Sequence, residues 1–186
     1  MRVKILILES CRSPEIQKPD TEPIILSKVF EAEGINYELY SNDYIWQTRI
    51  KLDQKKINTK LLEFNPGIVH LAVHGCSRGL VLTWSNEPDI GNRKAIDILT
   101  PQKIRLMTAF QGRLIASGAC ESAQLADDFK FAGAKAVVAP SAPVPWARIG
   151  LFFQQFYKSY FKSQNVQYSL TVAIKEYPEY NSYQVY

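Results

Sequence analysis

Cysteine and histidine are scarce in this chain of 186 residues, which has three cysteines and two histidines. A sparse, odd number of cysteines provides no disulfide framework and favours a reducing, cytoplasmic compartment. Long hydrophobic runs are also missing, since no stretch approaches the roughly 18 apolar residues that a membrane-spanning helix needs. The apolar run near the N-terminus is short and stops at Glu9-Ser10-Cys11 without a small-residue cleavage site. This pattern predicts a core strand rather than a signal peptide.

The chain also lacks a strong excess of charge of either sign. Its net charge is +4, and charged residues make up 22% of the sequence, as in ordinary globular proteins. The densest basic stretch, Lys51–Lys60, has helical spacing, which indicates a solvated helix face rather than a nucleic-acid surface. We therefore expect neither nucleic acid nor membrane as a partner. The length favours a single domain over residues 1–186.

What the sequence does contain is an alternation of short apolar runs and amphipathic segments. Short apolar runs bounded by turn residues are typical of strands covered on both faces. The order predicts an α/β fold, a three-layer α/β/α sandwich around a mostly parallel, doubly wound sheet of about six strands. Strands are predicted at Val3–Leu8, Asn36–Tyr40, Ile68–Gly75, Arg113–Ala119, Lys135–Ala139 and, at a late edge, Ser182–Tyr186, with a small surface strand at Leu80–Trp84. Helices are predicted after Thr21 and Thr100 and over Leu52–Phe64, Ser122–Ala132, Trp146–Lys162 and Tyr168–Glu176.

Two of the predicted strands end on a residue that can do covalent chemistry. His74 ends one apolar run and Cys120 ends another. The tips of neighbouring parallel strands converge on one crevice, where a thiol and an imidazole are the minimum set for nucleophilic catalysis. The small neighbours Gly75 and Gly118 would let a substrate backbone approach. The helix predicted after Cys120 would favour a thiolate.

Two other constellations compete for the chemistry. Gly75–Gly79 reads Gly-Cys-Ser-Arg-Gly, the nucleophile-elbow pattern of serine hydrolases, but a strand rather than a helix is predicted to follow Ser77, and both histidines precede it. We therefore interpret it as a loop. A zinc site would draw on His70, His74, Cys76 and Cys120.

The zinc hypothesis fails on distance, because positions 70 and 74 of one strand lie roughly 13 Å apart. Zinc ligands must approach one point within about 2.0–2.3 Å. We interpret His70 as a core histidine with a satisfied hydrogen bond. No phosphate-binding glycine pattern follows a strand either, so we expect no metal and no cofactor.

The segments around His74 and Cys120 resemble the paired signature of caspase-like cysteine peptidases, the clan of caspases, legumain, clostripain, gingipains and separase. Within that clan the chain is most similar to bacterial CHAT domains. Ile68–Gly75 is close to the first block, and Ser117–Ser122 is close to the second, where Gly118 is added to the usual Ser-Ala-Cys-Glu run. The resemblance is specific from about 61 to 160. Further similar segments are Leu125-Ala126, Phe129, Phe131–Ala139 and Phe152–Tyr157. Outside this range only the order of the elements agrees, and Ser182–Tyr186 lies where the family has its last edge strand.

The resemblance implies a role for each group. Cys120 would attack the scissile peptide carbonyl, and His74 would protonate the leaving amine. Backbone N–H groups of Gly75 and Cys120 would form the oxyanion hole, which usually supplies the largest catalytic contribution.

One loop departs from the family pattern. Many CHAT sequences carry acidic residues after the fifth strand, and Ser141–Arg148 contains none. Glu121, Asp89 or Asp97 could line the substrate pocket in its place. Trp146 is a candidate wall of the same pocket, and the alternative is that it caps the helix that follows.

The sequence leaves two main functions open. The first is a cysteine endopeptidase that acts on protein or peptide substrates. The second is a catalytically inactive CHAT-like domain that serves as a binding or assembly module, and a flavodoxin-like binder of small ligands is a remote third. Because CHAT domains are often fused to sensor or repeat modules, a separate sensor or regulatory protein is an expected partner.

Overall fold

A six-stranded sheet forms the centre of the computed structural model, which describes residues 3–10, 21–41, 52–84 and 94–186. The strand order is β2-β1-β3-β7-β8-β9, and every neighbouring pair is parallel except β8 and β9. The mostly parallel sheet predicted from the sequence is confirmed. Its strands are β1 (Lys4–Glu9), β2 (Asn36–Ser41), β3 (Ile68–Ala72), β7 (Leu114–Ser117), β8 (Ala136–Pro140) and β9 (Tyr183–Val185).

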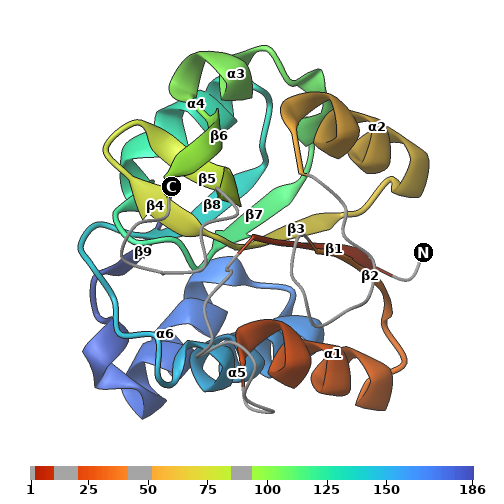
Figure 1. The fold of residues 1–186 in the computed structure, drawn as a ribbon. Helices are drawn as coiled ribbons and strands as arrows, with labels where there is room; N and C mark the ends of the chain where they lie inside the picture. Colours follow the sequence, from red (N-terminus) through yellow and green to blue (C-terminus); the bar gives the residue numbers. More distant parts are fainter. Residues whose placement is uncertain (1–2, 11–20, 42–51, 85–93) are drawn as a thin grey trace.

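Helices cover both faces of this sheet and complete the predicted three layers (Figure 1). Helices α1, α5 and α6 lie on one face, and α2, α3 and α4 lie on the other. The α-helices are α1 (Glu22–Ala32), α2 (Gln54–Phe64), α3 (Pro101–Arg105), α4 (Ala126–Phe131), α5 (Ile149–Ser163) and α6 (Val166–Glu176). Short 3₁₀ turns are η4 (Thr108–Phe110), η5 (Ser122–Leu125) and η6 (Pro178–Tyr180).

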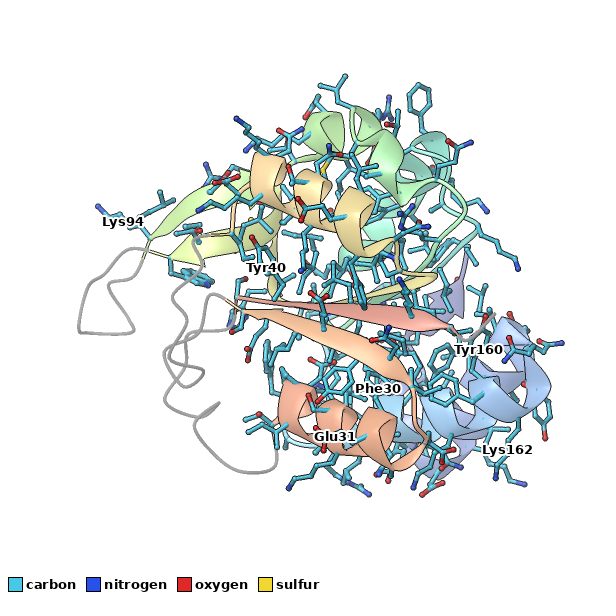
Figure 2. The ribbon with its side chains drawn as sticks, turned by 90° about the vertical axis from the view of Figure 1, so that its right-hand side faces the viewer. Phe30, Glu31, Tyr40, Lys94, Tyr160 and Lys162 are labelled. Carbon is cyan, nitrogen blue, oxygen red and sulfur yellow. The ribbon has the colours of Figure 1, made fainter. Side chains whose placement is uncertain are left out.

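The alternation of side chains along β1 explains why both faces need a cover. Leu6 and Leu8 belong to the core beneath α2 to α4, whereas Ile5 and Ile7 belong to the core beneath α1, α5 and α6. Successive strand residues point to opposite faces, so a continuous apolar run contributes apolar side chains to both cores. Aromatic side chains dominate the second core. Figure 2 shows Phe30 between the sheet and α1, and its ring centroid lies 5.1 Å from that of Tyr157.

The predicted third strand is the main error in the sequence-based fold. Ile68–Gly75 is not one strand, because β3 ends at Ala72 and the chain turns at Val73 into β4 (His74–Cys76). β4 belongs to a second, three-stranded antiparallel sheet with β5 (Gly79–Trp84) and β6 (Ala95–Leu99). His74 therefore begins a new strand instead of ending a core strand.

The second sheet also corrects the prediction of a small surface strand. β5 is buried over nearly its whole length, and Leu80 and Leu82 join the core beneath α2 to α4. β6 was not predicted. Ser77 lies in the turn of the hairpin between β4 and β5 and is exposed, so no helix follows it and the elbow pattern has no structural counterpart.

Capping side chains mark the starts of α2 and α3. Thr100 accepts a hydrogen bond from the Lys103 N–H, as predicted for the start of α3. Asp53 caps α2 through the Lys56 N–H, and Asn65 ends that helix in the left-handed conformation. None of the helices in the described ranges is both long and apolar enough to cross a lipid bilayer.

Candidate active site

The tips of β3 and β7 lie side by side in the centre of the sheet. Leu71 pairs with Ser117, and the Gly118 N–H donates to the Leu71 carbonyl at 2.9 Å. His74 and Cys120 each lie three residues beyond this pairing. The chain segments that lead to His74 and Cys120 therefore leave the main sheet next to each other, although His74 itself lies in the second sheet.

Gly75 packs directly on the backbone of Cys120. An ideal Cβ at position 75 would lie 2.1 Å from the Cys120 carbonyl oxygen and 3.4 Å from the Cys120 nitrogen. Only a residue without a side chain fits this contact. The two segments that the sequence singled out thus meet through their main chains, and His74 is the direct neighbour of the contact.

Two buried serines hold the turn that carries Cys120. Ser122 Oγ lies 2.8 Å from Ser117 Oγ and 2.7 Å from the Ala119 carbonyl oxygen. The Ala119 N–H donates back to Ser117 Oγ at 3.3 Å. Glu121 follows in the left-handed conformation with φ +54°, which non-glycine residues adopt rarely and often at functional turns. No described residue accepts a hydrogen bond from the Cys120 N–H, which leaves that amide available to a ligand.

The helix predicted over Ser122–Ala132 is divided in the structure. A 3₁₀ turn, η5, comes first, and α4 begins only at Ala126. The left-handed Glu121 and the hydrogen bonds of Ser122 impose this tight first turn. The regular helix N-terminus predicted next to Cys120 is therefore not formed, because α4 has only six residues and begins at Ala126.

His74 is enclosed by two indole rings. The centroid of its ring lies 4.6 Å from that of Trp146, at an interplanar angle of 37°, and 5.4 Å from that of Trp84, which it meets edge-on. Burial lowers the pKa of His74 from its ordinary value of 6.5, because a desolvated imidazolium is costly. The imidazole is therefore neutral at pH 7.

Removing the Trp146 indole tests this cause directly. In a Trp146→Ala variant the His74 ring gains water on one face, so its pKa is expected to rise towards 6.5. An NMR titration of the His74 ring in the wild type and in the variant measures the shift. An unchanged His74 titration would assign the desolvation to Trp84 and the backbone instead.

The loop before α5 contacts both candidate groups. Trp146 lies against His74, and the Cys120 thiol donates a long hydrogen bond to the Val144 carbonyl at a sulfur–oxygen distance of 3.8 Å. The Glu121 N–H donates to the Ala142 carbonyl at 3.5 Å. The predicted helix over Trp146–Lys162 begins only at Ile149, which leaves Trp146 in the loop.

His70 takes no part in a site with His74. It is fully buried, its Nε2 lies 2.9 Å from Glu22 Oε1, and its Nδ1 lies 2.9 Å from the Tyr157 hydroxyl. Both ring nitrogens are occupied on the face of α1 and α5, as expected of a core histidine. Within the described ranges, no cluster of three or more histidine, cysteine, aspartate or glutamate side chains is arranged to hold a metal ion.

The predicted pocket residues lie in different places relative to His74 and Cys120. Trp146 covers His74, and Glu121 is exposed beside Cys120. Asp97 lies on β6, where Lys103 holds its carboxylate at 2.7 Å. Asp89, like Cys11, lies outside the described residues.

Three residues near the site were missed by the sequence analysis. Ser122 has a local signal, because a hydroxyl two residues after a strand-end cysteine can fold back on the turn. Trp84 and Glu22 have none. Trp84 reaches His74 through the second sheet, and Glu22 reaches His70 across 48 positions of the chain.

Comparison with known proteins gives a family match for this chain. None of the curated proteins compared with the chain matches it. Residues 25–182 match the family described as CHAT domain, a span that includes both sheets' central strands and the turns that carry His74 and Cys120. The chain therefore belongs to the CHAT domain family, which is related to the caspase-like cysteine peptidases.

Proposed function

We propose that this CHAT domain is a cysteine endopeptidase with Cys120 as nucleophile and His74 as its proton carrier. The observation that carries the proposal is the contact between Gly75 and the Cys120 main chain, which brings the His74 strand and the Cys120 turn together. Membership of the CHAT family supports the same reading.

The proposed reaction begins with transfer of the thiol proton. Because the pKa of His74 lies below 6.5, its neutral imidazole takes the proton from Cys120 when the thiol turns away from Val144. The sulfur attacks the peptide carbonyl carbon, and the main-chain amides of Gly75 and Cys120 stabilise the resulting oxyanion. His74 then passes the proton to the leaving amine. Water hydrolyses the thioester and regenerates the thiol.

The substrate in this proposal is a protein or peptide. Trp146 and Glu121 flank the reacting groups and would contact the residue at the cleavage site, and Asp89 stays a candidate for the same pocket. The free thiols of Cys76 and Cys120 fit a reducing, cytoplasmic compartment.

A second function, as an inactive binding or assembly module, is favoured by one specific observation. The loop Ser141–Arg148 has no acid, and it lies on both His74 and Cys120 through Trp146 and Val144. A loop that stays closed would block substrate. A separate sensor or regulatory protein that moves this loop would reconcile both functions.

Two measurements distinguish these functions. Site-resolved mass spectrometry of iodoacetamide-treated protein is expected to show Cys120 reacting faster than Cys11 and Cys76. Mapping new N-termini in a proteome treated with wild-type or Cys120→Ala protein is expected to show cleavages with the wild type alone. Equal reactivity of the three thiols together with identical N-termini would leave only the binding function.

A further inference from the structure

A buried carboxylate lies beneath the turn that carries Cys120. The Glu22 side chain, in the first turn of α1, is 2% exposed. Its Oε1 accepts the hydrogen bond from His70, whereas its Oε2 has no hydrogen-bond partner among the described residues. A buried carboxylate with one unsatisfied oxygen is costly, so its presence calls for an explanation.

Two glycines create the space that Glu22 occupies. A Cβ at Gly118 would lie 2.7 Å from Glu22 Oε1 and 2.8 Å from Oε2, so the carboxylate is seated directly against the Gly118 backbone. A Cβ at Gly150 would lie 3.0 Å from the Glu22 Cα, so α5 lets α1 approach closely.

A chain of hydrogen bonds fixes the carboxylate from the other side. Burial and the nearby Glu22 charge raise the pKa of Tyr157 well above its ordinary value, so its hydroxyl stays protonated. The Tyr157 O–H can then donate to His70 Nδ1, and the His70 Nε2–H donates to Glu22. Each member determines the orientation of the next, and the positive end of α1 favours the carboxylate.

The buried Tyr183 hydroxyl is influenced by both Glu22 and Cys120. The Tyr183 hydroxyl is buried without a hydrogen-bond partner among the described residues. Its pKa is raised well above the ordinary value by burial, then by Glu22, and also by Tyr180 and Cys120. Glu22 and Cys120 thus act on the same hydroxyl from two elements.

We propose that Glu22 is a positioning residue whose carboxylate, held by His70 and seated against Gly118, sets the position of the 118–120 backbone and thereby of the Cys120 thiol and amide. This inference rests on the proposed function for its catalytic consequence. The backbone placement itself does not depend on it.

Glu22→Asp and Glu22→Gln separate positioning from simple stability. Aspartate keeps the charge but is one methylene shorter, so it withdraws the carboxylate from Gly118 or from His70. Alkylation of Cys120 by iodoacetamide is then expected to slow about 10-fold or more, since small displacements in a reacting site are costly. Glutamine keeps the shape and an oxygen acceptor for His70, so Glu22→Gln is expected to stay within about 3-fold of the wild-type rate, following the same geometric argument. If peptide cleavage is detected, Glu22→Asp is expected to lower kcat and leave KM unchanged.

A compensating pair provides the matched control. Gly118→Ala alone introduces the clash with the carboxylate and is expected to slow alkylation, and Glu22→Ala in the same chain removes the carboxylate and is expected to recover part of the loss. Wild-type alkylation rates in folded Glu22→Asp and Gly118→Ala would overturn the proposal, whatever their melting temperatures.

Hydrogen exchange of the amides at 117–122 separates this inference from the proposed function. Faster exchange in Glu22→Asp than in the wild type is expected even if the Cys120 thiol proves unreactive. An unreactive wild-type thiol would end the peptidase proposal. Unchanged exchange in Glu22→Asp would end the positioning proposal.

Discussion

Gly75→Ala is expected to lower the free energy of unfolding by about 1–3 kcal/mol, as overpacking against a fixed wall does, and to slow alkylation of Cys120 by about 100-fold. The added methyl group would lie 2.1 Å from the Cys120 carbonyl oxygen. That atom belongs to the main chain and cannot turn aside as a flexible side chain would. The whole turn from Gly118 to Glu121 must therefore shift, and the thiol and the Cys120 amide shift with it.

Gly67→Ala is the matched control for this substitution. Gly67 immediately precedes β3, and a Cβ there would meet its nearest neighbour, Val3 Cγ1, at an ordinary distance of 3.9 Å. This variant is expected to keep the wild-type stability and thiol reactivity. Thermal unfolding and site-resolved alkylation of both variants provide the comparison, and equal behaviour of the two would contradict the contact between Gly75 and Cys120.

The main sheet could be predicted because each of its central strands has a recognisable local sequence pattern. β1, β3, β7 and β8 are short apolar runs bounded by turn residues, and their parallel order follows from the helices between them. The end of β3 could not be predicted in the same way. Val73 continues the apolar run and is buried, yet the chain leaves the main sheet there, because the register that pairs Leu71 with Ser117 stops and β4 pairs with β5.

The candidate site could also be predicted only in part. His74 and Cys120 could be proposed from sequence because each stands at the end of an apolar run. The surroundings of His74 could not, since Trp84 and Trp146 come from a strand and a loop whose approach depends on tertiary packing. Glu22 was equally hidden, because a glutamate at the start of a helix normally faces solvent.

The loop Ser141–Arg148 links these findings to regulation of the proposed activity. Its Val144 carbonyl accepts from the thiol, and its Trp146 ring covers the imidazole. The loop therefore contacts both groups, and in the proposed reaction contacts to the substrate would replace the Val144 and Trp146 contacts together. A partner that draws this loop away would expose the thiol and hydrate the imidazole in a single movement.

His74→Ala is expected to reduce peptide-amide cleavage by about 10²–10⁴-fold, the usual contribution of general acid–base catalysis. Hydrolysis of a 4-nitrophenyl ester should fall much less, because the phenolate leaves without a proton whereas the amine must receive one.

In the wild type, amide cleavage is expected to decline as the pH falls through the pKa of His74, which burial holds below 6.5, because the protonated ring cannot accept the thiol proton.

Cys120→Ala is the control for both substrates, since removal of the sulfur abolishes ester and amide hydrolysis alike. The ratio of ester to amide rates in His74→Ala therefore isolates the proton delivered to the leaving group. Equal losses for the two substrates would mean that His74 acts on the thiol alone. A wild-type amide rate in His74→Ala would remove His74 from the reaction and with it the dyad that the contact between Gly75 and Cys120 supports.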